Sequence, residues 1–247
     1  MRDQPLFSLS LFIVVGVAIA LATFNGSVRK NPNRLRQVAQ QENNANSMPV
    51  VDYEATEHII PGDTKRQSKN KHYDDASFVL KGPTEGGTAT RFDDWELGLA
   101  PLPAQQSDVV VLGTITDARA YLSADKTGVY SEFALKVETV LKDDGSQAGS
   151  EDTVVVTRPG GRVRYRSGKT MEYTISGQRM PDVGKRYVLF LRQEEHDYSL
   201  VTGYELRAGR VYPLDAVKKF DNYRGADETE FLSQLRRSIA ETAKAKR

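Results

Sequence analysis

The chain of 247 residues contains no cysteine. This absence excludes disulfide frameworks, thiolate zinc sites, cysteine nucleophiles and a lipid-bearing N-terminal cysteine. A protein of this composition that is exported must therefore rely on its hydrophobic core for stability.

The chain also lacks an excess of positive charge, because 34 Lys and Arg residues face 33 Asp and Glu residues. Nucleic-acid-binding domains usually carry a basic excess, so nucleic acid is an unlikely partner. Hydrophobic residues make up 39% of the chain, which is modest for one or two domains of this length.

Residue patterns for catalysis or metal binding are missing as well. The three histidines, His58, His72 and His196, are isolated, and none belongs to an HExxH motif. The sequence has no GxSxG elbow, P-loop or GxGxxG motif. The acidic residues on either side of His196 are typical of a solvated turn. We therefore predict a protein without catalytic residues, metal or cofactor, and thus not an enzyme.

One long hydrophobic run is present, at residues 6–24, and no charge interrupts the chain between Asp3 and Arg29. This length is close to the roughly 20 apolar residues that cross a bilayer as a helix. Two interpretations remain open for residues 1–28. They form either a signal peptide, cleaved after the small residues at 20–22, or an uncleaved single-pass anchor.

Both interpretations predict an exported protein, either secreted or anchored to the cell membrane through residues 6–24. The basic flank at residues 29–36 leaves the orientation open, because positive residues tend to stay on the cytoplasmic side of a membrane. We favour the periplasmic or extracellular side for the bulk of the chain.

Residues 29–106 are rich in Asn, Gln, charged and turn-forming residues. Such a composition buries too little apolar surface to offset chain entropy, so we predict a long, mostly disordered tether. Two islands interrupt it, residues 76–80 (ASFVL) and 92–99 (FDDWELGL), the latter with the only tryptophan, Trp95. They either pack on the folded domain, which we favour for Trp95, or form a motif that binds a partner.

The folded domain is predicted at residues 107–216, around the stretch VYSEFALKVETVL at 129–141. Alternate residues of this stretch are apolar, which places Phe133 and Leu135 on the inner face of a long β-strand. Further strands are expected at 108–118, 153–157, 162–166, 170–176, 186–192, 198–202 and 209–213. No helices alternate with them, so the sequence predicts an all-β fold, a small barrel or sandwich.

Residues 217–247 are predicted to end in a helix. Asp227 followed by Glu230 matches a capping box with Asp in place of Ser or Thr. Four apolar residues then follow at helical spacing, and we expect this stripe to dock on the β-domain. The stripe consists of Phe231, Leu232, Leu235 and Ile239.

The order of these motifs resembles the netrin-like branch of OB-fold domains, which includes the tissue inhibitors of metalloproteinases. The resemblance rests on DVVVLGTIT at 108–116, on Val140-Leu141-Lys142 at the end of the long strand, and on Gly184-Lys185-Arg186-Tyr187 before a later strand. It implies an OB-like barrel. It does not imply protease inhibition, because those inhibitors place an N-terminal cysteine on the protease zinc and this chain has none.

One cluster of charges stands out within the β-domain. Three arginines alternate with Val163 and Tyr165, which on a strand puts all three on one outward face. Arginine forks suit phosphate and carboxylate groups, so this face is a candidate anion-binding site. The alternative is a solvated edge strand whose charges prevent aggregation. The candidate residues are Arg158, Arg162, Arg164, Arg166 and Lys169.

Together these features predict a membrane-tethered or secreted, non-enzymatic β-barrel that acts as a binding module of the cell envelope. An anionic lipid, a glycan or a protein partner is the expected ligand. The alternatives are a hydrolase with unrecognised residues and a purely structural envelope protein.

Overall fold

The computed structural model describes residues 48–54, 63–74, 86–146, 148, 152–195 and 197–245. All of them belong to the compact unit formed by residues 40–247. The apolar run at 6–24 and the island at 76–80 lie outside the described residues. Within the described ranges, no helix combines the length and the apolar character that crossing a membrane requires.

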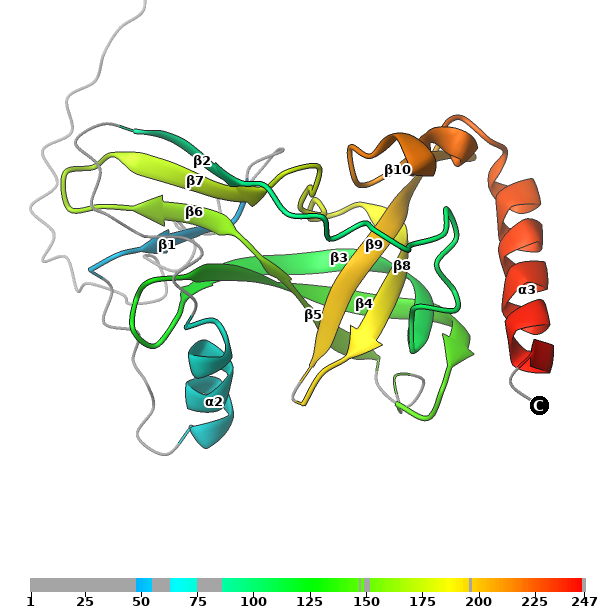
Figure 1. Ribbon diagram of the computed structural model, residues 1–247, viewed down its shortest axis with the longest axis horizontal. Coiled ribbons are helices and arrows are strands. Elements are labelled where there is room, and N and C mark those ends of the chain that lie inside the picture. The colour runs from blue at the N-terminus through cyan, green and yellow to red at the C-terminus, as the bar shows by residue number, and fades with distance from the viewer. Residues whose placement is uncertain are drawn as a thin grey trace, which may run out of the picture. The chain divides into compact units, whose positions relative to one another are not determined.

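The centre of the fold is a closed ring of five strands (Figure 1). The sheet has the order β10-β9-β5-β4-β3-β8, and a further pairing of β9 with β8 joins its two sides. Pairing is antiparallel throughout the ring except between β5 and β9, which run parallel. The strands are β3 (Val109–Leu122), β4 (Val129–Asp143), β5 (Thr153–Pro159), β8 (Arg186–Gln193), β9 (Tyr198–Arg207) and β10 (Arg210–Pro213).

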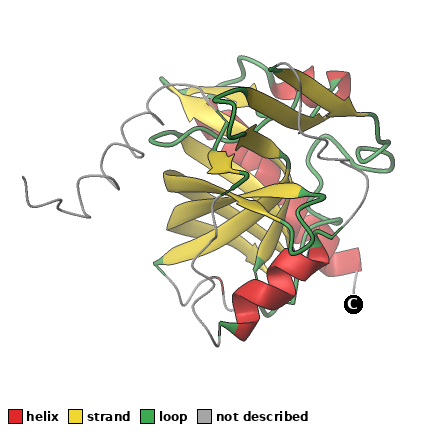
Figure 2. Cartoon of the chain, turned by 90° about the vertical axis from the view of Figure 1, so that its left-hand side faces the viewer, coloured by secondary structure: helices red, strands yellow, loops and turns green. Residues whose placement is uncertain are grey.

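A second, four-stranded sheet has the order β1-β6-β7-β2. In Figures 1 and 2 it lies above the strands of the ring. Its buried residues pack on the end of the β3–β4 hairpin, where Ala120, Leu122 and Val129 contact Val163 and Tyr173 in one cluster. The strands are β1 (Val50–Asp52), β2 (Gly87–Arg91), β6 (Gly161–Arg164) and β7 (Thr170–Ile175).

The chain passes from the ring to the second sheet through Gly160, between β5 and β6. Gly160 has a φ of +103°, which L-residues rarely adopt. A Cβ atom there would also lie 2.6 Å from the carbonyl oxygen of Tyr173 on β7. Glycine is therefore required both by the turn and by the close approach of the neighbouring strand.

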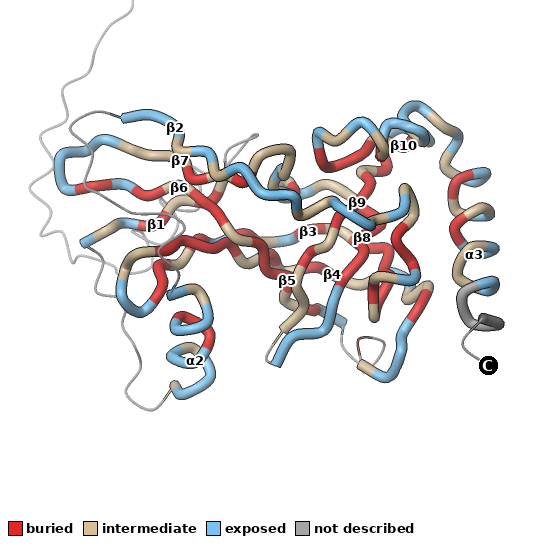
Figure 3. The backbone as a smooth tube through the Cα atoms, viewed as in Figure 1, coloured by how far each residue is buried: buried red, intermediate tan, exposed pale blue. Residues whose placement is uncertain are grey.

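Alternation along the ring strands produces two cores, one on each face of the sheet (Figure 3). All five ring strands contribute to one core, which therefore fills the interior of the ring. Its strand residues are Val109, Val111, Ile115, Ala118, Phe133, Leu135, Val154, Val156, Tyr187, Leu189, Leu191 and Leu200. The other face of β3, β8 and β9 carries Val110, Leu112, Val188, Phe190, Tyr204 and Leu206. These two faces explain the continuous apolar run of β8, because both of its sides are buried.

The outer core is covered by the C-terminal segment. The 3-10 helix η2 (Lys218–Tyr223) contributes Phe220, and the α-helix α3 (Glu228–Ala245) contributes Phe231 and Leu235. Asp227 caps α3, because its Oδ1 accepts hydrogen bonds from the amides of Thr229 (2.9 Å) and Glu230 (3.2 Å). The all-β architecture and the C-terminal helix predicted from the sequence are thus confirmed.

The prediction of a disordered tether at residues 29–106 needs correction. Strands β1 and β2 form the two edges of the second sheet, and the helix α2 (Thr64–His72) packs on the ring. In residues 92–106, Trp95 packs on the outer core and stacks with Phe220 at 6.2 Å between ring centroids, as the favoured packing interpretation predicts. The composition misled for β1, β2 and α2, because these elements attach through backbone pairing and ion pairs, which require few apolar residues.

Substitution of Phe133 by Ala tests the ring core. The side chain is fully buried, so we expect a loss of about 3–5 kcal/mol in the free energy of unfolding, measured by chemical denaturation. Phe92→Ala is the matched control, because Phe92 is 84% exposed. Equal losses for the two variants would show that the interior face of β4 is assigned wrongly.

Candidate functional site

The arginine-rich hairpin shows the predicted alternation only in part. Val163 and Tyr165 are buried, whereas Arg164 and Arg166 are exposed and Arg162 is partly exposed. Strand β6 ends at Arg164, so Arg166 and Lys169 lie at the turn between β6 and β7. Four of the five candidates are thus neighbours on one hairpin.

Carboxylates on neighbouring strands form ion pairs with arginines of this hairpin. Arg164 binds Asp52 of β1 through two hydrogen bonds, 2.5 Å from Nε and 3.1 Å from Nη2. Arg162 pairs with Glu172 on β7 at 3.5 Å. The guanidinium groups of Arg162 and Arg164 are therefore engaged in ion pairs within the sheet, whereas Arg166 and Lys169 are exposed at the turn.

Arg158 does not belong to this hairpin surface at all. Its guanidinium is fully buried and binds the carboxylate of Asp215 with two hydrogen bonds, of 2.7 and 2.9 Å. The same carboxylate accepts hydrogen bonds from the amide of Arg179 (2.9 Å) and the hydroxyl of Thr202 (2.8 Å). Arg158 is therefore a structural residue that joins β5 to the segment after β10, and it is removed from the candidate anion site.

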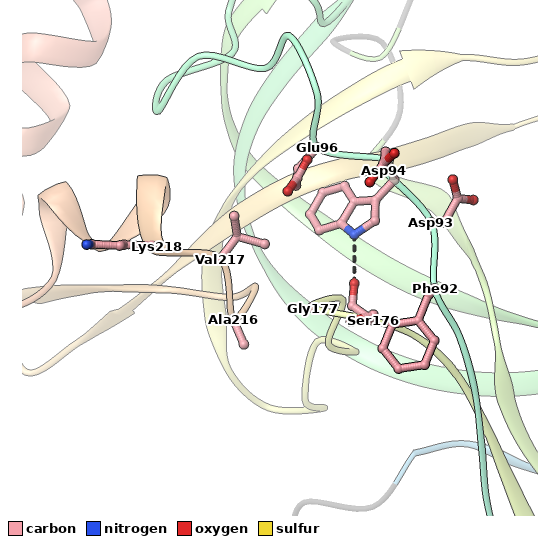
Figure 4. Close-up of a pocket in the computed structure, with 10 residues that line it drawn as sticks. Phe92, Asp93, Asp94, Glu96, Ser176, Gly177, Ala216, Val217 and Lys218 are labelled. Carbon is pink, nitrogen blue, oxygen red and sulfur yellow. Dashed lines mark hydrogen bonds between the residues drawn. The ribbon is translucent and has the colours of Figure 1, made fainter.

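A different surface feature is a groove of about 800 Å³ where residues 92–96 pass the end of β7 and the start of η2 (Figure 4). Its back is formed by Trp95, whose indole N–H donates to the carbonyl oxygen of Ser176 at 2.9 Å. The lining residues are Phe92, Asp93, Asp94, Trp95, Glu96, Ser176, Gly177, Ala216, Val217 and Lys218.

Two further contacts hold the segment that lines the groove. Lys219 on η2 donates to the carbonyl oxygen of Glu96 at 2.6 Å, and Arg158 lies 5.8 Å from the centre of the Trp95 ring. Asp215 precedes the groove residues Ala216 and Val217, so the buried Arg158–Asp215 pair also fixes the opposite wall. The groove is thus built on ordered elements.

Apolar side chains are exposed beside this groove. Phe92 is 84% exposed and Leu97 is 70% exposed. Among the described residues, only Val183 at 45% joins them as a large exposed hydrophobic side chain. Two large apolar side chains within six positions of each other, next to a groove, are typical of a surface that contacts a partner.

The charge of the groove is acidic. Its lining holds three carboxylates, those of Asp93, Asp94 and Glu96, and one lysine, Lys218. Figure 4 shows the three carboxylates along one side of the groove. Asp93 pairs with Arg91 at 3.1 Å. The Glu96 Oε2 atom is buried and has no hydrogen-bond partner within the described part of the chain. Asp93 and Asp94 are exposed, so theirs are the carboxylates that a cationic ligand in the groove can reach.

The carboxylates after β8 also differ from the prediction of a solvated turn. Glu194 and Glu195 are exposed, but Asp197 pairs with Lys65 at 3.7 Å and also with Lys69, both on α2. His58 and His196 lie outside the described residues, and His72 ends α2 with its ring edge-on to Tyr73 at 5.1 Å. No group of His, Asp and Glu within the described ranges has the arrangement of a metal site.

Comparison with known proteins adds no family. The chain matches no protein-family model, no curated protein and no solved structure. The function is therefore argued from the geometry of this chain.

Sequence reasoning missed Asp215 and Glu96, because neither lies in a recognisable motif. The lone tryptophan was the available signal, since a tryptophan in a polar segment indicates that the segment packs on a core. This signal located the segment that lines the groove, but it did not predict that the groove is acidic.

The Arg158–Asp215 pair gives a stability prediction. Asp215→Ala leaves a buried guanidinium unpaired, so we expect a loss of roughly 3–5 kcal/mol in the free energy of unfolding. The matched control is Asp221→Ala, which breaks an exposed pair with Arg224 and should cost about 0–1 kcal/mol. A loss for Asp215→Ala as small as that expected for Asp221→Ala, about 1 kcal/mol or less in the same denaturation experiment, would contradict the anchoring role.

Proposed function

We propose that this chain is a membrane-tethered or secreted β-barrel module of the cell envelope that binds a protein partner and has no catalytic activity. Export and tethering rest on the apolar run at residues 6–24. The binding role rests on the groove beside Phe92.

An OB-like, netrin-like barrel is the fold we propose for the ring. The OB-fold is a five-stranded Greek-key barrel, and the ring here also closes with five strands. Two of the motifs behind the resemblance support this proposal, since Val140-Leu141-Lys142 lies at the end of β4 and Gly184-Lys185-Arg186-Tyr187 leads into β8. Lys142 ties the end of β4 to the segment before β3, because its buried ammonium donates to the carbonyl oxygen of Ala104 at 2.8 Å.

The charge and the exposed side chains of the groove favour a partner segment that carries a basic side chain beside an apolar one. Phe92 offers an exposed aromatic surface for the apolar group, and Asp94 offers an exposed carboxylate for the basic group. A Lys or Arg side chain of the partner would pair with Asp94. The exposure of Phe92 at the edge of the groove is the observation that carries this proposal.

An anionic ligand on the arginine hairpin has less support. Arg162 and Arg164 already bind Glu172 and Asp52, and Arg158 is buried. We therefore assign the partner-binding role to the groove, with a ligand of opposite charge to the one expected from the sequence.

Selection from random linear peptides displayed on phage tests this proposal with the full chain in mild detergent. We expect enriched peptides to combine Lys or Arg with an adjacent apolar residue. Loss of an aromatic anchor in Phe92→Ser costs about 1–2 kcal/mol, so the Kd of a selected peptide should rise roughly 5- to 30-fold. Asp94→Asn should weaken binding of peptides that carry the basic residue.

Two controls separate the groove from general surface effects. Val183→Ser removes an exposed apolar side chain elsewhere, and Glu241→Gln removes an exposed carboxylate on α3. Neither should change the Kd of the selected peptides. Enrichment of acidic peptides, or binding that survives both Phe92→Ser and Asp94→Asn, would refute the proposed site.

A further inference from the structure

The helix α2 is unusual because it contains no apolar residue. Its sequence is TKRQSKNKH, and Asp63 caps it by accepting a hydrogen bond from the amide of Arg66 at 2.9 Å. Isolated helices shorter than about 12–15 residues are marginal in water. The nine residues of α2 are therefore helical because the ring holds them.

Three basic residues of α2, Lys65, Arg66 and Lys69, pair with two carboxylates of the ring. Arg66 binds Glu132 of β4 with a fork of hydrogen bonds, 2.5 Å from Nη1 and 3.0 Å from Nη2. Lys69 lies 2.6 Å from Glu132 and also bonds Asp197, in the turn between β8 and β9. The side chains of Glu132 and Asp197 are only 11% and 10% exposed beneath the helix. The helix thus shields both carboxylates from water.

Tyrosines of the ring complete the contact. The hydroxyl of Tyr130 donates to Asn70 Oδ1 at 2.6 Å, and the Tyr130 ring stacks between Tyr73 at 4.1 Å and Tyr121 at 5.5 Å. The guanidinium of Arg66 lies 4.0 Å from the centre of the Tyr121 ring. Aromatic faces and carboxylates together are the groups that recognise arginine and lysine side chains.

Electrostatics shows how strongly this contact depends on charge. Burial by itself would raise the pKa of Glu132, but the hydrogen bonds and charges of Arg66 and Lys69 outweigh it and lower that pKa. Burial lowers the pKa of Lys69, although its hydrogen bond to Glu132 opposes this. Each group is therefore costly to bury without the other.

Two clefts border α2. One, of about 260 Å³, is lined by Arg66 of α2 and by ring residues that include Arg119, Tyr121 and Glu132. The other, of about 160 Å³, lies between α2 and the ring, next to Val155 and Asp197. Figure 2 shows a helix in the foreground against the strands, and this helix is α2 of Figure 1 seen from the left-hand side. The helix therefore leaves space open beside Glu132 and Val155, which line both clefts.

We propose that this surface, defined by Tyr121, Tyr130, Glu132 and Asp197 and called here the acidic-tyrosine face, is a binding site for a basic polypeptide segment of a partner. Helix α2 is its occupant within the chain and competes with the partner. The partner segment carries two basic residues three positions apart, the spacing of Arg66 and Lys69. This site shares no residue with the groove at Phe92, so neither proposal depends on the other.

Competition within one chain sets the apparent affinity. A tethered segment acts at an effective concentration of about millimolar order, so α2 suppresses a weaker partner. The apparent Kd of the partner equals its intrinsic Kd divided by the fraction of molecules in which the face is open. A substitution that weakens α2 without touching the face therefore strengthens binding of a segment supplied from outside.

The test uses a fluorescent peptide with the sequence of residues 63–74 and the full chain in mild detergent, followed by fluorescence anisotropy. Lys69→Gln weakens α2 and leaves Glu132 and Asp197 intact. We expect its apparent Kd for the peptide to be at least about fivefold lower than that of the parent chain. Lys71→Gln is the matched control, because Lys71 is an exposed residue of the same helix and loses the same charge. It should bind like the parent.

Three results would overturn the proposal. The first is equal Kd values for the parent, Lys69→Gln and Lys71→Gln chains. The second is binding that persists when Glu132→Gln or Asp197→Asn is added to Lys69→Gln, with thermal unfolding checking that each variant remains folded. The third is equal binding of a peptide with the same residues in scrambled order, because the proposal requires the three-residue spacing of the basic groups.

Discussion

Closure of the ring by β9 is the constraint on which the rest of the structure depends. Strand β9 pairs with β5 in parallel on one side and with β8 on the other, so the five strands enclose one core. Closure also removes free sheet edges within the ring. Every other element is then placed by the ring surface that it covers. The outer face of β3, β8 and β9 receives η2 and α3, and the β3–β4 hairpin supports the second sheet.

These attachments are of three physical kinds: burial of apolar surface, ion pairing and backbone pairing. The C-terminal helix and Trp95 bury apolar surface, which holds them firmly and with little dependence on salt. Helix α2 buries carboxylates and tyrosines through ion pairs, and β1 and β2 add by backbone pairing to edges of the second sheet. Charge-based attachments are opposed by desolvation and screened by salt, so they can exchange with a competing ligand. The two proposed binding surfaces differ in the same way. The groove combines an exposed aromatic side chain with charged groups, whereas the acidic-tyrosine face relies on charge and aromatic stacking.

The sequence predicted the elements whose residues alternate clearly. Phe133 and Leu135 lie on the inner face as expected, and the capped helix after Asp227 forms with its apolar stripe toward the core. It failed where folding depends on partners far away in the chain. Arg66 and Lys69 fell within the predicted tether because Glu132 and Asp197, which bind them, lie far along the sequence. Arg158 likewise could not be separated from Arg162 and Arg164, because only the fold brings Asp215 to it.

Amide hydrogen exchange of the full chain at low and high salt tests the central claim most directly, namely that a stable ring carries a charge-held helix. The account predicts that amides of β3, β4 and β8 exchange slowly and equally in both conditions. Amides of α2 should exchange faster than those of the ring, by local opening, and their protection should fall further at high salt. Protection of α2 that equals the protection of the ring and does not change with salt would contradict the account.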